Sequence, residues 1–383
     1  MKIAVLETGE AVHRYKKSLV VSFNGRRRVL STAPHNGGYR ENLTAAFNQD
    51  GTVGAGMACT LKAPTYAEHM ALVAQEIGLD AERAVGISTA AQMENVSVKT
   101  EKWNELAVTA VVTGGIEVNG GRVGDVASWN EVDGKAIAVK QGTINIMVFF
   151  NVDLAEGTLV RALVTCTEAK TAAIQELLAP SRYSMGLATG SGTDGTILVA
   201  NMDSPILLTD AGKHSKLGEL IGKAVKAAVK EALNLQSGLC PKRQHEVVMR
   251  MDRFGITHDV VWENYSGKKT RAEFEEYLEE LLRRDMLVTY TSLYVHLLDQ
   301  LMWGMISRDE AVLAAKSLRV LMEMEDAGKG NNDQTDDNHA VRFMIDKFSD
   351  LPAGCMTELS VISDLIRKYG AGLMYLIRKE EEK

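Results

Sequence analysis

The chain has 383 residues, of which 45% are hydrophobic and 24% charged, and its formal net charge is −7 at pH 7. These values are typical of a packed globular protein, and the length favours more than one domain. Because a net negative charge gives no basic field that attracts phosphate backbones, we expect no nucleic-acid partner.

The chain shows no signal for export or for a membrane span. Its first ten residues contain Glu7 and Glu10, which interrupt the apolar core that a signal peptide needs. The longest apolar stretch, 142–155, contains Asp153 and is shorter than the roughly 18 residues of a span. The 4 cysteines lie far apart without a C-x-x-C pair, which predicts free thiols. We therefore expect a soluble, cytoplasmic protein.

The first part of the chain is typical of strands followed by one helix. Asn24-Gly25 separates two β-rich runs within 18–30, which predicts a hairpin. Thr65 and Glu68 have the spacing of a capping box, and Gly78 stands where the helix that they begin would end. Two further strands are predicted over 83–89 and 106–113.

Strand and helix signals then mix without strict alternation. We predict a strand over 142–152, a helix over 156–178, strands over 196–201 and 205–209, and an amphipathic helix over 215–233. Because strands outnumber helices and do not alternate with them, the sequence favours an α+β fold, with a mixed β-sheet core packed with helices, over a doubly wound sheet.

The character of the chain changes at 236–241, a segment rich in helix breakers. Thr270 with Glu273, and Ser307 with Glu310, form two further capping boxes that begin helices. We predict an α+β domain over 1–236 and a mostly helical extension over 237–383, whose amphipathic helices suit a homo-oligomer. The polar segment 327–339 is predicted to be mobile.

A glycine-rich loop over 186–196 is the most distinctive polar feature. Gly190, Gly192 and Gly195 match G-x-G-x-x-G formally, but a helix precedes this loop and a strand follows it, the reverse of a dinucleotide site. The loop either binds an anion or an oxyanion through backbone amides and polar side chains, or only connects helix and strand. Those side chains are Thr189, Ser191, Thr193 and Asp194.

Histidines mark two other turns. His35 opens the run His35-Asn36-Gly37-Gly38, where a loop on a rigid scaffold suits acid–base chemistry or metal ligation, or a purely structural role. Lys213 and His214 precede the 215–233 helix, where they would strengthen anion binding at the helix amino end or merely flank its cap.

Glu168 and Lys170 lie two positions apart on the 156–178 helix, so they point roughly 200° apart and at most one can face a given pocket. Glu168, nearer the Leu163 side, is our candidate, with a solvated helix face as the alternative. No histidines have metal-ligand spacing, and no resident cofactor is predicted. A divalent metal stays open, because two histidines and nearby carboxylates could meet in space.

Several runs together resemble one family. They are STAPHNGG (31–38), AVVTGGI (110–116) with Gly124-Asp125, GTINIMV (142–148), TEAKTAA (167–173), ATGSGTDGTILVA (188–200) and AGKHSKLGELIGKAV (211–225). In this order, over about 1–235, they are similar to adenosylcobinamide amidohydrolases. The resemblance implies hydrolysis of the amide that joins aminopropanol to a corrin-ring propionate. The products would be adenosylcobyric acid and 1-amino-2-propanol, in cobinamide salvage for cobalamin biosynthesis.

The resemblance and the local chemistry together predict a corrinoid site in one cleft. We expect His35 or His214 as the acid–base, with Asp194 or Glu168 orienting a histidine or activating water. The nucleophile is left open between water, Thr189, Ser191 and Thr193. Predicted substrate contacts are Asn36, Gly37, Gly38, Asn145, Thr189, Gly190, Ser191, Gly192, Thr193 and Lys213. The alternatives are a corrinoid-binding protein without catalysis and an amidohydrolase with another substrate.

Overall fold

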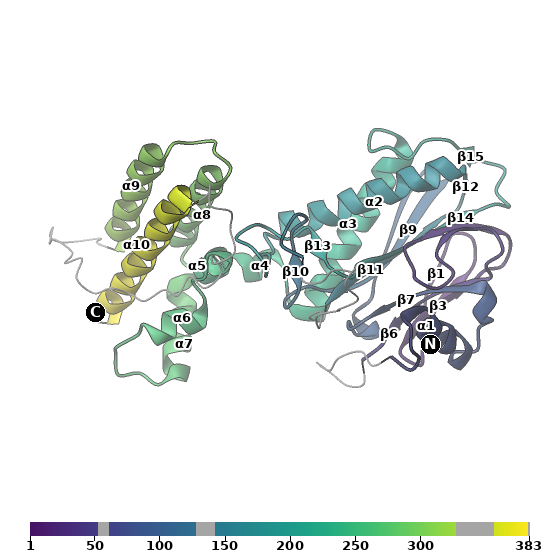
Figure 1. The fold of residues 1–383 in the computed structure, drawn as a ribbon, viewed down its shortest axis with the longest axis horizontal. Helices are drawn as coiled ribbons and strands as arrows, with labels where there is room; N and C mark the ends of the chain where they lie inside the picture. Colours follow the sequence, from purple (N-terminus) through teal and green to yellow (C-terminus); the bar gives the residue numbers. More distant parts are fainter. Residues whose placement is uncertain (53–60, 128–141, 327–355, 382–383) are drawn as a thin grey trace. The chain divides into compact units, whose positions relative to one another are not determined.

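The computed structural model describes residues 1–52, 61–127, 142–326 and 356–381. The chain forms two compact units (Figure 1). The first consists of Met1–Tyr183 and Leu187–Cys240, and the second of Ser184–Gly186 and Pro241–Lys383. Each unit has a hydrophobic core of its own.

The first unit is built on two mixed sheets. The five-stranded sheet has the order β1-β2-β3-β6-β7, and the six-stranded sheet the order β5-β4-β14-β11-β9-β8. Within them only β6 with β7 and β11 with β14 run parallel. Their strands are β1 (Lys2–Val5), β2 (Ala11–Tyr15), β3 (Ser18–Ser22), β4 (Arg27–Ser31), β5 (Gly38–Arg40), β6 (Ala45–Asp50), β7 (Ala84–Thr89), β8 (Ser97–Trp103), β9 (Leu106–Gly115), β11 (Thr143–Phe150) and β14 (Gly195–Asn201).

Short strands and helices complete this unit. Two small ladders pair β10 with β13 and β12 with β15. These elements are β10 (Gly120–Gly121), β12 (Asp153–Leu154), β13 (Gly190–Ser191), β15 (Leu207–Leu208), α1 (Tyr66–Glu76), η1 (Ala81–Arg83), η2 (Met93–Asn95), α2 (Glu156–Glu176) and α3 (Lys216–Ser237).

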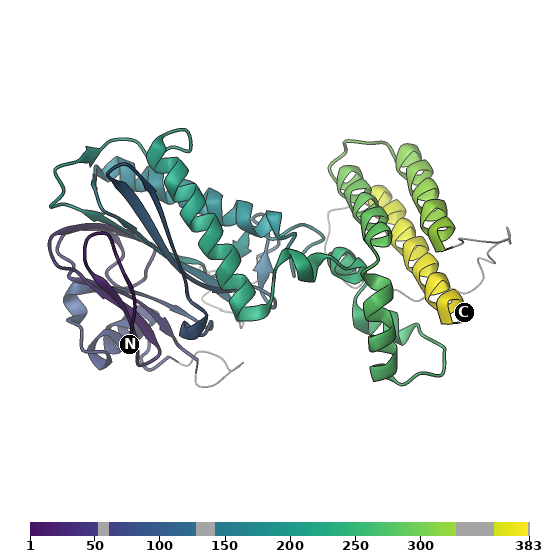
Figure 2. The ribbon, with the colours of Figure 1, turned by 180° about the vertical axis from the view of Figure 1, so that it is seen from behind.

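The apolar faces of the strands determine how the layers of this unit pack. Buried side chains such as Val21, Ile87, Met147 and Val199 pack between the two sheets. The outer face of the six-stranded sheet packs under α2 and α3, which Figure 2 shows side by side. Helix α1 covers the outer face of the five-stranded sheet. The predicted α+β class, with mixed sheets and helices, is confirmed.

The predicted hairpin at Asn24-Gly25 is wrong, because β3 and β4 belong to different sheets. Gly25 instead lets the Asp203 carboxylate lie against the backbone, since a Cβ there would overlap it. The actual hairpin joins β2 to β3 through Lys16 and Lys17, which take the left-handed conformation with φ of 47° and 55°. Lysine gives no sequence signal for that conformation, which usually selects glycine or asparagine.

The predicted helix starts agree with the structure. Thr65 and Glu68 form the reciprocal capping box of α1. Ser215 caps α3 by accepting a hydrogen bond from the Gly218 backbone. The capping box of Thr270 and Glu273 begins α7. These caps pair amides that the first helical turn leaves without partners.

The second unit is helical wherever the structure assigns it regular secondary structure, and its core takes side chains from α5 through α10. Tyr294 of α8 donates a hydrogen bond to the Leu365 carbonyl oxygen of α10, at 2.8 Å. Its helices are α4 (Pro241–Gln244), α5 (Val247–Met251), η3 (Asp252–Phe254), α6 (His258–Glu263), α7 (Arg271–Leu282), α8 (Asp285–Met302), α9 (Arg308–Asp326) and α10 (Met356–Glu381). The segment 327–339, predicted to be mobile, lies outside the described residues.

A buried ion pair organises this helical unit. Arg253 donates two hydrogen bonds to Asp299, at 2.7 and 2.6 Å, and a further one to the Met185 carbonyl oxygen. The two side chains are only 5% and 10% exposed. The pair therefore holds the segment Ser184–Gly186 in the helical core.

In the part of the chain that the structure describes, no helix is long and apolar enough to cross a membrane.

We expect Asp299→Ala to lower the free energy of unfolding of the second unit by about 3–5 kcal/mol, because it leaves a buried guanidinium without its counter-ion. Hydrogen exchange of the α8 amides measures this loss. Asp364→Ala is the control, since Asp364 pairs with Arg367 and Lys368 at the surface and its loss costs at most about 1 kcal/mol. Equal effects of the two substitutions would contradict the assignment.

Candidate functional site

The first unit contains a pocket of about 860 Å³, lined by segments that lie far apart in the sequence. This volume lies near the upper end of the ~300–1,000 Å³ typical of ligand sites. Its wall consists of residues 121–123, 125–127 and 189–193, the side chains Thr167, Lys170 and Thr171 of α2, and Tyr183.

Backbone pairing places the glycine-rich loop in this pocket. β13 pairs antiparallel with β10, and the chain then turns into β14 of the main sheet. The Thr189 amide donates to the Gly121 carbonyl oxygen at 2.8 Å, and the Thr189 hydroxyl accepts from the Val123 amide at 2.9 Å. The context of the loop is therefore strand to strand, which excludes the dinucleotide arrangement.

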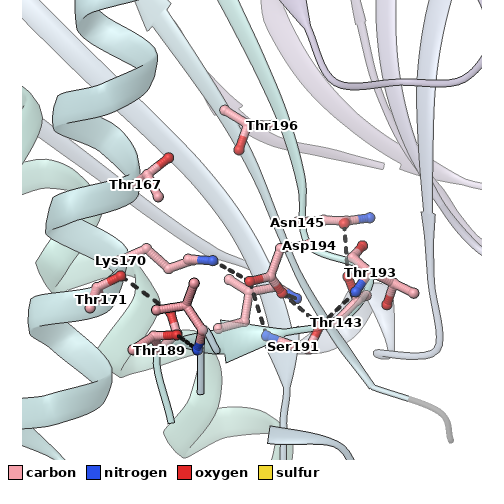
Figure 3. A network of polar contacts seen from close by, with 12 residues as sticks. Thr143, Asn145, Thr167, Lys170, Thr171, Thr189, Ser191, Thr193, Asp194 and Thr196 are labelled. Atoms are coloured by element: carbon pink, nitrogen blue, oxygen red, sulfur yellow. Dashed lines mark hydrogen bonds and ion pairs between the residues drawn. The ribbon is translucent and has the colours of Figure 1, made fainter. Parts of the chain in front are cut away.

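The Asp194 carboxylate is the centre of a polar network behind Lys170 and Ser191, two residues that line the pocket (Figure 3). It accepts hydrogen bonds from the Ile144 amide at 2.9 Å, the Ser191 amide at 3.1 Å and the Ser191 hydroxyl at 2.7 Å. Lys170 points from α2 toward the same carboxylate and forms an ion pair with it. Both charged side chains are nearly buried, at 12% and 13% exposure. Buried charges of this kind are stable only when they are paired.

Gly190 permits this ion pair to lie against the backbone. A Cβ at this position would overlap Asp194 Oδ2 and Lys170 Nζ. Gly192, two residues later, has open space where its Cβ would be. The first glycine is therefore a packing requirement of the network, and the second is not.

Several side chains at the rim of the pocket are apolar, whereas Lys170 and the 189–193 loop make its floor polar. Val123 and Val126 are 83% and 73% exposed, and Tyr183 is 40% exposed. Beside them, the Asp125 carboxylate accepts hydrogen bonds from the Arg122 amide at 2.7 Å and the Ser181 hydroxyl at 2.6 Å. Exposed apolar side chains around a polar floor are typical of a ligand site.

Asn145 of β11 lies next to Gly195, at the end of the glycine-rich loop. Among the described residues, it is not one of those that line the pocket. It is 1% exposed, and its amide donates to Asn48 Oδ1 at 2.8 Å and to the Ser88 carbonyl oxygen at 2.9 Å. The Thr143 hydroxyl donates to the Thr193 carbonyl oxygen at 2.7 Å. These contacts hold the start of β11, which pairs with β14 where the loop enters the sheet.

Glu168 and Lys170 face different pockets, as helix geometry predicted. The residue that lies beside the glycine-rich loop, however, is Lys170 and not Glu168. Lys170 lies in the pocket, whereas Glu168 lies in a separate one. Sequence reasoning missed Lys170, although it stands four positions after Cys166 and four before Ile174, which are both fully buried. That spacing places it on the inward face of the helix.

His35 and its neighbours form a tight structural turn. His35 Nε2 lies 2.7 Å from the Ala81 carbonyl oxygen, and the Asn36 amide donates to the carbonyl oxygens of Ala81 and Ala84, at 2.8 and 2.9 Å. Asn36 and Gly38 both have positive φ, and a Cβ on Gly37 would overlap the Ala33 carbonyl oxygen. This turn ties the strand β4 to the start of β7, and its residues are not among the described lining of the 860 Å³ pocket.

His214, Lys213 and Glu168 meet in a second pocket of about 410 Å³ at the amino end of α3. Lys213 and Glu168 form an ion pair at 3.0 Å, with side chains 63% and 48% exposed. The structure therefore brings Glu168, Lys213 and His214 together, and brings Asp194 together with 189–193, but it does not unite these sets with His35 in one cleft.

Among the described residues, no group of three or more histidine, cysteine, aspartate or glutamate side chains is placed to hold a metal ion. Cys166 lies one turn before Lys170 and is fully buried. Burial raises the pKa of its thiol to about 12, so that the thiol stays protonated near neutral pH.

We expect Gly190→Ala to displace the Lys170–Asp194 pair and to lower the free energy of unfolding of the first unit by about 1–3 kcal/mol, as overpacking does. Gly192→Ala is the matched control, with an expected change within about 0.5 kcal/mol. Denaturant unfolding of both variants measures the difference. A Gly190→Ala protein as stable as the Gly192→Ala protein would contradict this view of the network.

Comparisons with known proteins give a family match that covers most of the first unit. The family model of adenosylcobinamide amidohydrolase matches residues 3–241. The uncharacterized protein MJ1613 of Methanocaldococcus jannaschii is 35% identical over 228 residues, which cover 57% of this chain and 86% of that protein. Among solved structures, the PH0078 protein of Pyrococcus horikoshii OT3 matches with a TM-score of 0.29 and 11% identity, over 67% of this chain and 89% of that one. That structural similarity is too weak to inform the fold or the site.

The matched family region contains both sheets and every residue that lines the 860 Å³ pocket. The motifs that form the Asp194 network are therefore motifs of the family region. The chain belongs to the adenosylcobinamide amidohydrolase family, whose members are hydrolases of amide bonds.

Proposed function

We propose that the first unit hydrolyses the amide that links aminopropanol to a corrin-ring propionate of adenosylcobinamide, giving adenosylcobyric acid and 1-amino-2-propanol. This reaction would serve cobinamide salvage for cobalamin biosynthesis. The observation that carries the proposal is the 860 Å³ pocket in the family region, with its apolar rim and with Lys170 in its lining, whose nearly buried partner Asp194 lies directly behind.

The chemistry of the pocket suits this substrate. A corrinoid is a large, flat macrocycle fringed with amides, so that it needs apolar contact for its ring and hydrogen bonds for its side chains. Val123, Val126 and Tyr183 would contact the ring edge. Thr167, Thr171 and the 189–193 loop offer hydroxyl and backbone groups to the amides.

The charged pair of Lys170 and Asp194 supplies what amide hydrolysis requires. The reaction needs a base, a charge that stabilises the oxyanion and a proton for the leaving amine. Asp194 can accept and return a proton, and the Lys170 ammonium can stabilise developing negative charge. We therefore assign the acid–base role to Asp194 rather than to His35 or His214.

The direct experiment incubates the protein with adenosylcobinamide and measures released 1-amino-2-propanol and adenosylcobyric acid by mass spectrometry. Cobinamide and cobalamin are run beside it as alternative substrates. Release from adenosylcobinamide supports the proposal. Tight binding without release would indicate a corrinoid-binding protein, and release only from another amide would indicate a different substrate. Either result contradicts the proposed reaction.

We expect Asp194→Asn to lower kcat by about 100-fold or more, because the amide cannot accept the proton. His214→Ala is the control, since His214 lines the second pocket, and its kcat is expected to stay within about threefold of the wild type. Steady-state kinetics of both variants, with corrinoid binding measured by co-elution, checks the assignment. A larger loss of kcat in His214→Ala than in Asp194→Asn would contradict the assignment and indicate that His214 is the acid–base.

For the second unit we propose self-association. On α9, Leu313 and Val320 are 69% and 52% exposed and lie seven positions apart, hence on one face. We expect the wild-type protein to behave as a homo-oligomer in light scattering, and Leu313→Glu to convert it to a monomer, because a charge at an apolar interface is costly. A wild type that is monomeric throughout the micromolar range would contradict this.

A further inference from the structure

The glycine-rich loop presents the hydroxyls of Thr189, Ser191 and Thr193, and their hydrogen bonds distinguish them. The Thr189 hydroxyl accepts from the Val123 amide at 2.9 Å, and the Thr193 hydroxyl donates to the Gly142 carbonyl oxygen at 2.9 Å. The Ser191 hydroxyl donates to Asp194 Oδ1 at 2.7 Å. We propose that Ser191 is the nucleophile and Asp194 its base. This inference rests on the proposed function.

The contact between Ser191 and Asp194 has the geometry that an activated hydroxyl needs. A serine attacks an amide only if a base within about 2.6–3.2 Å takes its proton. Ser191 and its neighbours line the pocket, so that the hydroxyl can reach a bound amide. A carbonyl oxygen, the partner of the Thr193 hydroxyl, cannot act as a base of this kind.

The base is held in one orientation by groups other than the serine. The Ile144 amide donates to Asp194 Oδ1 at 2.9 Å, and the Ser191 amide donates to Oδ2 at 3.1 Å. Lys170 pairs with Oδ2 from the other side, on α2. A nucleophile, a base and a third group that orients the base is the arrangement shared by serine hydrolases of unrelated folds.

The charge of Lys170 suits each stage of the reaction. In the resting site the ammonium balances the negative charge of the carboxylate. Proton transfer accompanies the attack, since the hydroxyl becomes strongly acidic as its oxygen bonds to carbon. Once Asp194 is protonated, the negative charge lies on the oxyanion of the substrate, and the ammonium stabilises it in place of the carboxylate.

The acylation step balances as follows. The Ser191 Oγ–C bond forms while the hydroxyl proton moves to Asp194, which gives a tetrahedral intermediate. The C–N bond then breaks, and Asp194 returns the proton to the nitrogen of the leaving 1-amino-2-propanol. The corrinoid acid is left as an ester of Ser191.

Deacylation repeats these moves with water. A water molecule attacks the ester carbon and gives a proton to Asp194, and the bond from carbon to Oγ breaks as Ser191 takes that proton back. The corrinoid acid is released, and the cycle consumes one water. The predicted intermediate is therefore an ester, which a stronger nucleophile than water can intercept.

The first measurement compares Ser191→Ala with the wild type on adenosylcobinamide. We expect kcat to fall by more than about 100-fold, the scale of loss for a nucleophile. Ser204→Ala is the control, because the Ser204 hydroxyl, like that of Ser191, accepts a hydrogen bond from the amide two residues later, and Ser204 has no part in the site. Turnover by Ser191→Ala within about 100-fold of the wild type would overturn the assignment.

The second measurement keeps the proposal testable even if Ser191→Ala fails to fold. Wild-type protein turning over adenosylcobinamide in hydroxylamine is expected to yield the hydroxamate of the corrinoid acid, at an unchanged rate of 1-amino-2-propanol release. Formation of the free acid alone would mean direct attack by water and would overturn the proposal. A wild type that releases no 1-amino-2-propanol is a different failure, that of the proposed function itself.

Discussion

The need to neutralise one buried carboxylate explains most of the architecture around the site. Asp194 accepts hydrogen bonds from the Ile144 and Ser191 amides and pairs with Lys170. These donors come from the sheet, the loop and α2, so that satisfying one charge fixes three elements against one another. A buried carboxylate without such partners would cost several kcal/mol. The glycine at 190 serves the same requirement, because a side chain there would overlap the ion pair.

The sequence predicted the parts of the fold that depend on local signals. Thr65 with Glu68 and Thr270 with Glu273 cap helices where expected, because a capping box acts within one turn. The hairpin prediction failed because the strands on either side of Asn24-Gly25 belong to different sheets, and Gly25 lies against Asp203, a residue far along the chain. The real hairpin turns on Lys16 and Lys17, in a conformation that lysine does not favour. In the first case a long-range contact replaces the expected turn, and in the second the residue type gives no local signal.

The candidate site likewise has features that local sequence signals predict and features that depend on long-range packing. The 189–195 loop could be chosen from its glycines and hydroxyls, and the opposed directions of Glu168 and Lys170 followed from helix geometry. Which of the two faces the loop depends on how α2 lies on the sheet. His35-Asn36-Gly37-Gly38 has the composition of a catalytic turn, yet its polar groups bind the backbone of Ala81 and Ala84. Composition alone does not separate a turn that binds a ligand from a turn that joins two sheets.

The central claim is that the corrinoid occupies the pocket over Asp194, and hydrogen exchange with and without adenosylcobyric acid, the proposed product, tests it most directly. Binding there predicts slower exchange in 120–127 and 187–195, with unchanged exchange in 210–218. Protection confined to 210–218 and the start of α3 would place the ligand in the pocket of His214 and contradict the account.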